Sequence, residues 1–245
     1  MRKRADVLLV ERGLAANRSR AQALLLAGRV YSGECRIDKP GQLLADDAEL
    51  QVRGTDRYVS RGGDKLEGAL VALCLDVRNL VCVDIGASTG GFTDCLLQHG
   101  AERVFAVDVG HGQLDLKLRG DSRVVVMERT NARFLTAADF DARIDLAVVD
   151  ASFISLELLL PAISALLAPG GRVLALVKPQ FEAGKKAVQR GRGVIRDPAV
   201  RDAAIGKVKT AVETSGFELL GECDSTLPGP KGNLERFVLA VKRSA

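Results

Sequence analysis

The sequence has 245 residues, of which 47% are hydrophobic and 27% charged, and its formal net charge is +4. A chain of this length can form one sizeable core and a small accessory domain. No stretch approaches the roughly 18 consecutive apolar residues of a membrane span. No apolar signal core follows the N-terminus either, so we expect a cytoplasmic protein that does not act on a membrane.

The cysteines and histidines argue against two further classes of site. The five cysteines are widely spaced without a C-x-x-C pair, and the two histidines are His99 and His111. Neither a disulfide framework nor a metal site is therefore predicted.

Residues 1–54 are predicted to form a small α+β domain. Apolar residues at helical spacing indicate one helix over 5–13 and a second that ends at Gly28. Either Asn17 or Ser19 can cap the second helix. Short strands at 30–31 and 50–52 complete this domain.

Positive charge is concentrated in this domain. Arg18 and Arg20 stand at the expected start of the second helix, where exposed backbone amides and the helix dipole favour phosphate. A charged helix face is often merely solvated, so the residues alone leave RNA binding open. The candidate RNA-binding residues here are Arg4, Arg18, Arg20, Arg29 and Lys39.

The turn-rich residues 55–61 are predicted to link this domain to a second one over 62–245. There, continuous apolar strands alternate with helices, which indicates a mostly parallel sheet covered on both faces. The expected strands are 80–85, 104–108, 124–127, 144–149 and 173–177, and the expected helices are 64–75, 91–98, 156–167 and 198–215. Two further β-rich runs, 217–223 and 237–241, predict a closing antiparallel hairpin, which suits the methyltransferase variant of the Rossmann fold.

Segment 84–92 joins the first expected strand of this sheet to a helix, at the sheet edge where ligands bind in α/β folds. Its glycines permit a tight turn and close approach of the backbone to a ligand. Asp108 ends the next strand, where a carboxylate can accept hydrogen bonds from both ribose hydroxyls of an adenosine-containing cofactor. The predicted cofactor-binding residues are Asp84, Gly86, Ala87, Ser88, Thr89, Gly90, Gly91, Phe92, Asp108, Val109 and Asn131.

Two other interpretations of this loop stay open. The glycines can be simple turn residues, or the loop can bind a nicotinamide cofactor. Against the second, the loop lacks G-x-G-x-x-G, and the chain leaves no room for a separate substrate domain. S-adenosylmethionine needs no phosphate cradle and fits the loop better.

Charged residues follow two of the expected buried strands. Asp150 comes after the fourth strand and Lys178 after the fifth, so both should project at the edge that holds the cofactor loop. Lys65 and Glu235 can reach the same edge, although spacing does not prove it. The alternative is a structural ion-pair cluster.

These four residues resemble the K-D-K-E tetrad of FtsJ-type ribose 2′-O-methyltransferases. Segments 57–66, 84–92, 149–155, 176–182 and 231–235 closely resemble the TlyA family. That family joins an RNA-binding domain like that of small-subunit ribosomal protein four to an FtsJ-like methyltransferase, and it methylates cytidine ribose in ribosomal RNA. The resemblance covers nearly the whole chain and implies S-adenosylmethionine as cofactor and ribosomal RNA or a ribosomal subunit as partner. We also expect a monomer.

The resemblance also implies roles for the tetrad. A lysine acts as a base only when neutral, and burial or a second ammonium favours that form. We assign Lys178 as general base, Lys65 as its electrostatic partner, Asp150 as the acid that holds the base, and Glu235 as the acid that positions Lys65. Which lysine is the base stays open. One departure from many FtsJ-type loops is Thr89, where they carry proline.

Segment 184–193 is predicted to be a flexible basic loop beside this edge that clamps the RNA backbone, or else a solubilising loop. Its candidate RNA-binding residues are Lys185, Lys186, Arg190 and Arg192. For the substrate we favour 23S over 16S RNA. The alternatives for the whole protein are a non-catalytic RNA-binding or ribosome assembly factor, and a membrane-active haemolysin.

Overall fold

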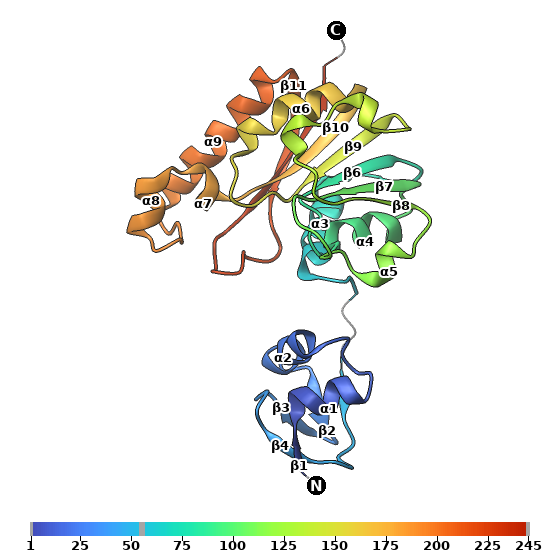
Figure 1. Cartoon of the computed structure of the whole chain (residues 1–245). Coiled ribbons are helices and arrows are strands. Elements are labelled where there is room, and N and C mark those ends of the chain that lie inside the picture. Colours follow the sequence, from blue (N-terminus) through green and yellow to red (C-terminus); the bar gives the residue numbers. More distant parts are fainter. Residues whose placement is uncertain (1, 54–56, 244–245) are drawn as a thin grey trace. The chain divides into compact units, whose positions relative to one another are not determined.

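The structure is a computed structural model that describes residues 2–53 and 57–243. The chain divides into two compact units, Met1–Asp56 and Arg57–Ala245. Figure 1 shows both units and labels most of their elements. No helix in the described ranges is long and apolar enough to cross a membrane.

The first unit is a small α+β domain. Its elements are β1 (Arg2–Arg4), α1 (Ala5–Glu11), α2 (Arg18–Leu26), β2 (Val30–Ser32), β3 (Cys35–Ile37), β4 (Leu43–Ala45) and β5 (Gln51–Val52). β1 pairs with β4, and β2 lies between β3 and β5, with every pair antiparallel. The Asn17 side chain caps α2 by accepting from the Arg20 backbone N–H. The helices and β2 match the sequence analysis, whereas the strands β1, β3 and β4 were not predicted.

The second unit is an α/β domain. Its strands are β6 (Val81–Ile85), β7 (Arg103–Val107), β8 (Val124–Met127), β9 (Ile144–Val149), β10 (Leu167–Val177), β11 (Phe217–Asp224) and β12 (Arg236–Lys242). Its helices are α3 (Arg61–Ala72), α4 (Gly91–Gln98), α5 (Leu116–Arg119), α6 (Leu160–Leu166), α7 (Pro179–Glu182), α8 (Lys185–Arg190) and α9 (Pro198–Thr214), with 3-10 turns η1 (Ala132–Phe134), η2 (Ala137–Asp139) and η3 (Leu156–Leu158).

Seven strands form one sheet in the order β11-β12-β10-β9-β6-β7-β8. The five strands from β10 to β8 are parallel, and β12 is antiparallel to both β10 and β11. The predicted mostly parallel sheet with a C-terminal antiparallel hairpin is thus confirmed.

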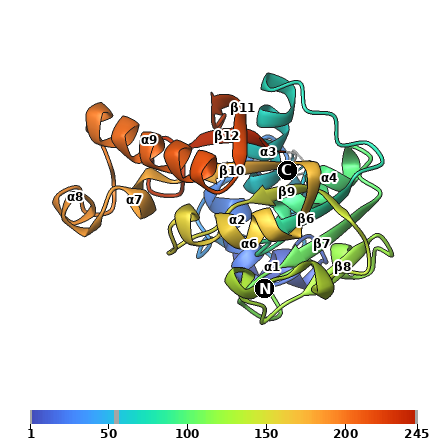
Figure 2. The ribbon, with the colours of Figure 1, turned by 90° about the horizontal axis from the view of Figure 1, so that it is seen from above.

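Helices cover both faces of this sheet (Figures 1 and 2). On one face α6 and α9 bury side chains such as Ile163 and Val208 against the strands. On the other face α3 and α4 bury Leu66 and Leu96. Because strand side chains alternate between the two faces, the central strands β6, β7 and β9 are apolar on both sides.

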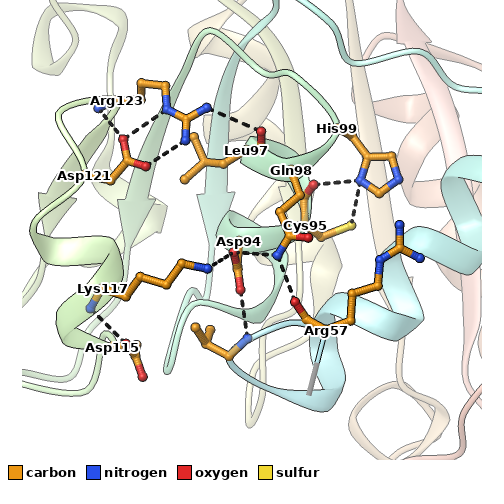
Figure 3. Close-up of polar contacts among 11 residues, drawn as sticks. Arg57, Asp94, Cys95, Leu97, Gln98, His99, Asp115, Lys117, Asp121 and Arg123 are labelled. Atoms are coloured by element: carbon orange, nitrogen blue, oxygen red, sulfur yellow. Dashed lines mark hydrogen bonds and ion pairs between the residues drawn. The ribbon is translucent and has the colours of Figure 1, made fainter. Parts of the chain in front are cut away.

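Residues 57–61 belong to the second unit, although the sequence analysis placed them in the linker. Tyr58 is 2% exposed, and the Val59 backbone N–H donates to Asp94 Oδ2 at 2.9 Å. Gln98 on α4 donates to the Arg57 carbonyl at 2.9 Å (Figure 3). Of the predicted linker, residues 55 and 56 lie outside the described residues.

Two other segments differ from the sequence analysis. The basic segment 184–193 is largely the short helix α8 rather than a loop. The expected helix 156–167 is instead η3 followed by α6, and residues 167–171 lie inside β10, whose register with β9 shifts between Leu167 and Arg172.

All five cysteines are free thiols. Cys35 in the first unit and Cys74 in the second are exposed, whereas Cys82 and Cys95 are buried. Burial raises the pKa of both the Cys82 and the Cys95 thiol to about 12.

Candidate active site at the carboxyl edge of the sheet

The strand order reverses between β6 and β9. The chain passes from β6 outward through β7 to β8 and then returns to the other side of β6 as β9. The loops that follow these two strands diverge, which opens a crevice at the carboxyl edge of the sheet. Asp150, just after β9, stays tied to β6 because its backbone N–H donates to the Ile85 carbonyl at 2.9 Å.

The loop after β6 requires its first glycine. Gly86 has φ +86°, and a Cβ added there would lie 2.8 Å from the Asp150 carbonyl oxygen. A side chain at this position would therefore be strained and would press the two diverging loops apart. Gly90, with φ +94°, forms the N-cap of α4, where a Cβ would collide with Leu118.

A cavity of about 360 Å³ occupies the crevice. Its volume lies within the usual range for small-molecule and cofactor sites. The predicted residues that line it are Gly86, Ser88, Asp108, Val109, Asn131 and Asp150. Lining residues that the cofactor prediction did not include are Ile85, Val107, Gln113, Thr130, Ala132, Ala151, Ser152, Phe153, Ile154 and Leu159.

Asp108 is held at one side of this cavity by two backbone donors. Its Oδ2 accepts from the Ser88 N–H at 2.8 Å and its Oδ1 from the Gly110 N–H at 2.7 Å. The side chain is thus fixed with an acceptor group beside the cavity. This arrangement fits an adenosine ribose, whose two hydroxyls need an acceptor.

The remaining predicted cofactor residues lie beneath the loop or beside it. Asp84 is fully buried and accepts from the Thr93 backbone N–H at 3.0 Å and from its hydroxyl at 2.7 Å, which ties β6 to α4. Burial raises the pKa of the Asp84 carboxyl to about 7. Ala87 and Phe92 are buried in the α3–α4 core, and the Thr89 carbonyl accepts from the Asp115 N–H. Gly91 begins α4, and a Cβ there would collide with Ser60.

The four charged residues form two ion pairs at this edge. Lys65 Nζ lies 2.6 Å from Glu235 Oε2, and both side chains are almost completely buried. Lys178 Nζ lies 2.6 Å from Asp150 Oδ1 and donates to Ser152 Oγ at 2.9 Å. Because Asp150 and Ser152 line the cavity, the second pair borders it directly.

Two further buried polar residues support this edge, and neither was among the predicted site residues, although both lie in segments that resemble the TlyA family. Glu182 on α7 accepts from Ser155 Oγ at 2.6 Å and from the Leu156 N–H at 2.9 Å, which fixes the loop after β9. Asn233, two residues before Glu235, accepts from the Ile195 N–H at 2.8 Å and donates to the Gly193 carbonyl at 3.0 Å. It therefore fastens the segment after α8 to the chain that carries Glu235.

An aromatic pair with one exposed ring lies beside the second ion pair. Phe153 is 91% exposed and has φ +65°, a conformation that a bulky residue rarely adopts. Its ring centroid lies 5.1 Å from that of Phe181 on α7. The loop after β9 thus presents an aromatic face at the cavity.

The predicted basic residues fall into two groups. In the first unit Arg4 and Arg18 both contact Asp6, while Arg20 and Lys39 are exposed and Arg29 is half-buried. In the second unit Arg192 is exposed with φ +50°. Lys185, Lys186 and Arg190 belong to α8, but their side chains lie outside the described residues.

Comparison with known proteins agrees with this geometry. The FtsJ-like methyltransferase family matches residues 58–243. A Bacillus subtilis (strain 168) protein named as a candidate rRNA methyltransferase, YqxC, is 50% identical over 96% of this chain and 84% of its own length. The Mycobacterium tuberculosis (strain ATCC 25618 / H37Rv) protein named 16S/23S rRNA (cytidine-2'-O)-methyltransferase TlyA is 46% identical over 97% of this chain and 89% of its own.

Solved structures agree as well. A Streptococcus thermophilus structure titled as a candidate hemolysin is 43% identical and superposes with a TM-score of 0.79, covering 100% of this chain and 90% of that one. An S-adenosylmethionine-dependent methyltransferase from Mesorhizobium loti, 17% identical with a TM-score of 0.53 over 71% of this chain and 96% of that one, shares the fold alone. Because the family matches most of the second unit and the relatives align over nearly the whole chain, this chain belongs to the FtsJ-like methyltransferase family.

Proposed function

We propose that the protein transfers a methyl group from S-adenosylmethionine to the 2′-hydroxyl of a cytidine ribose in ribosomal RNA, with 23S RNA favoured over 16S RNA. The observation that carries this proposal is the Lys178–Asp150 ion pair at the rim of the cavity, backed by the buried Lys65–Glu235 pair. We also propose that the protein acts in the cytoplasm as a monomer.

The cavity provides the cofactor site. Gly86 and Ser88 would form its floor, and Asp108 would hold the ribose of the cofactor. S-adenosylmethionine, when bound, supplies a methyl group on a positively charged sulfur. The fixed cavity wall would orient that methyl group toward Asp150 and Lys178, and such orientation supplies much of the rate in a displacement reaction.

Lys178 is the proposed general base. In its neutral form it would accept the proton of the ribose 2′-hydroxyl as that oxygen takes the methyl group, with the neutral thioether as leaving group. The new ammonium is then stabilised by Asp150 and by Ser152 Oγ, which already contact Nζ. Lys65, held by Glu235, is proposed to orient the attacking hydroxyl.

The aromatic pair Phe153 and Phe181 supports a nucleotide as substrate. An exposed aromatic ring beside a reaction centre offers a surface on which an unstacked base can lie. The α8 segment and the basic residues of the first unit are proposed to hold the RNA backbone, since phosphate contacts position a nucleic acid without reading its sequence.

The test is tritiated methyl transfer from S-adenosylmethionine to purified 23S RNA, 16S RNA and ribosomal subunits, by wild type and by Lys178→Ala. We expect label in one RNA, resistant to alkali at a single dinucleotide, and a loss of about 100-fold or more in the variant. Lys207→Ala is the control, because Lys207 forms an exposed ion pair with Glu157.

The other outcomes separate the alternatives. RNA binding without methyl transfer, despite measurable cofactor binding, would favour a non-catalytic assembly factor. Leakage of liposomes on addition of the pure protein would favour the membrane-active alternative. Full activity in Lys178→Ala would remove Lys178 from the role of base.

A further inference from the structure

A buried carboxylate of the first unit contacts two of its arginines. Asp6, in the first turn of α1, has an exposed fraction of 0%. Its backbone N–H donates to the Pro40 carbonyl at 3.2 Å, so the residue is fixed by the main chain as well. A buried charge of this kind is unfavourable unless it is fully compensated by hydrogen bonds.

The compensation comes from three side chains. Arg4 donates twice, from Nε to Oδ1 at 3.0 Å and from Nη2 to Oδ2 at 3.1 Å. Arg18 Nε donates to Oδ2 at 2.9 Å, and Gln22 Nε2 donates to the same oxygen at 3.0 Å. The hydrogen bonds from Arg4 above all hold the pKa of the Asp6 carboxyl well below its usual range.

The two arginines are anchored at one end and exposed at the other. The Arg4 and Arg18 side chains remain 44% and 58% exposed, whereas the Asp6 side chain is 0% exposed. Arg4 ends β1, and Arg18 is the first residue of α2. One buried carboxylate therefore fixes the relative position of two guanidinium groups that come from different elements.

We propose that Asp6 is a positioning residue that holds Arg4 and Arg18 as a preformed pair for successive phosphates of an RNA backbone. This inference rests on the proposed function, in which the first unit binds ribosomal RNA. The three groups carry a net charge of +1, since two guanidinium groups face one carboxylate. Asp6 thus reduces the attraction for RNA through its charge and increases affinity through the order that it imposes.

These two effects have opposite signs, so one substitution separates them. Asp6→Asn removes one negative charge beside the arginines and so raises the net charge by one. Charge alone would therefore tighten RNA binding. If positioning dominates, Asp6→Asn instead weakens binding by about tenfold, because the arginine side chains must then be ordered at the moment of binding. The matched control is Asp47→Asn, which makes the same charge change at an exposed position of the same unit.

The measurement is filter binding of the full-length protein to 23S and 16S RNA transcripts at several salt concentrations. We expect Asp47→Asn to bind at least as tightly as wild type and Asp6→Asn to bind more weakly. In an Arg4→Ala/Arg18→Ala background, Asp6→Asn should cause no further loss, because the groups that it positions are absent. Asp6→Asn binding that matches or exceeds that of Asp47→Asn would overturn the inference.

Folding is checked by thermal unfolding followed by circular dichroism. If Asp6→Asn does not fold, Arg18→Lys decides the question, because it keeps the charge but replaces the planar group whose Nε contacts Asp6. Weaker binding by Arg18→Lys supports the inference, and unchanged binding overturns it. Failure of wild type to bind either RNA would instead contradict the proposed function.

Discussion

Arg236 pairs with Val177 across the antiparallel ladder between β12 and β10. The residues just outside this pair, Glu235 and Lys178, therefore come to the same edge of the sheet. This register explains why an acid near the C-terminus can meet Lys65, which lies 170 positions earlier in the chain. It also makes the closing hairpin part of the active site rather than only an edge of the sheet.

The buried pair predicts a large effect on stability. Glu235→Gln leaves the Lys65 ammonium buried without its counter-charge, and we expect a loss of about 3–5 kcal/mol in the free energy of unfolding. The double variant Lys65→Met/Glu235→Gln should recover much of this loss, because no unpaired charge remains. Denaturant unfolding of the four members of the cycle checks this, and strictly additive effects would contradict it.

The first glycine of the cofactor loop predicts an effect on cofactor binding. Gly86→Ala places a side chain at positive φ and 2.8 Å from the Asp150 carbonyl oxygen, so we expect affinity for S-adenosylmethionine to fall about tenfold or more. Gly206→Ala in α9 is the control, because nothing lies within 4 Å of the added Cβ. Calorimetric titration should find the affinity of this control unchanged.

Asp84 predicts a pH dependence of stability. Its pKa is about 7 in the folded protein against 3.8 ordinarily, so the folded state binds the proton more tightly. Its contribution to the free energy of unfolding therefore decreases as pH rises from about 4 to about 7, by a total on the order of 4 kcal/mol. Asp84→Asn should remove this decrease. The free energy of unfolding of the variant should therefore exceed that of wild type most strongly above pH 7. Chemical unfolding at pH 5 and pH 8 measures the difference, and an equal gain at both values would be inconsistent with this account.

Replacement of Asn233 should reduce local order near the active site. Asn233→Ala removes the acceptor for the Ile195 N–H and the donor for the Gly193 carbonyl, which should destabilise the unit by about 1–3 kcal/mol. The Ile195 amide should exchange its hydrogen faster. The rate of methyl transfer should fall, because the position of Glu235 changes. Thr210→Ala on the exposed side of α9 serves as control. Unchanged exchange at Ile195 would argue against the anchoring role.

The sequence predicted the large sheet because the parallel strands pack against apolar side chains on both faces and so appear as continuous apolar runs. The carboxyl-edge positions of Asp150 and Lys178 followed from the same rule. The strands β1, β3 and β4 were missed because three residues are too few to show alternation and because, unlike β2 with Val30 and Tyr31, they contain no adjacent β-branched or aromatic residues. The partners of Asp6 and Asn233 could not be predicted, because isolated polar residues carry no periodic signal and their burial depends on contacts between distant segments.

The exposed cysteines allow each unit to be labelled selectively with a dye. Cys35 and Cys74 are exposed in different units, whereas burial suppresses thiolate formation at Cys82 and Cys95. A maleimide dye should therefore react first with one position in each unit. With Cys223 replaced by serine, donor and acceptor dyes on this pair would report by energy transfer whether the distance between the two units changes when ribosomal RNA is added.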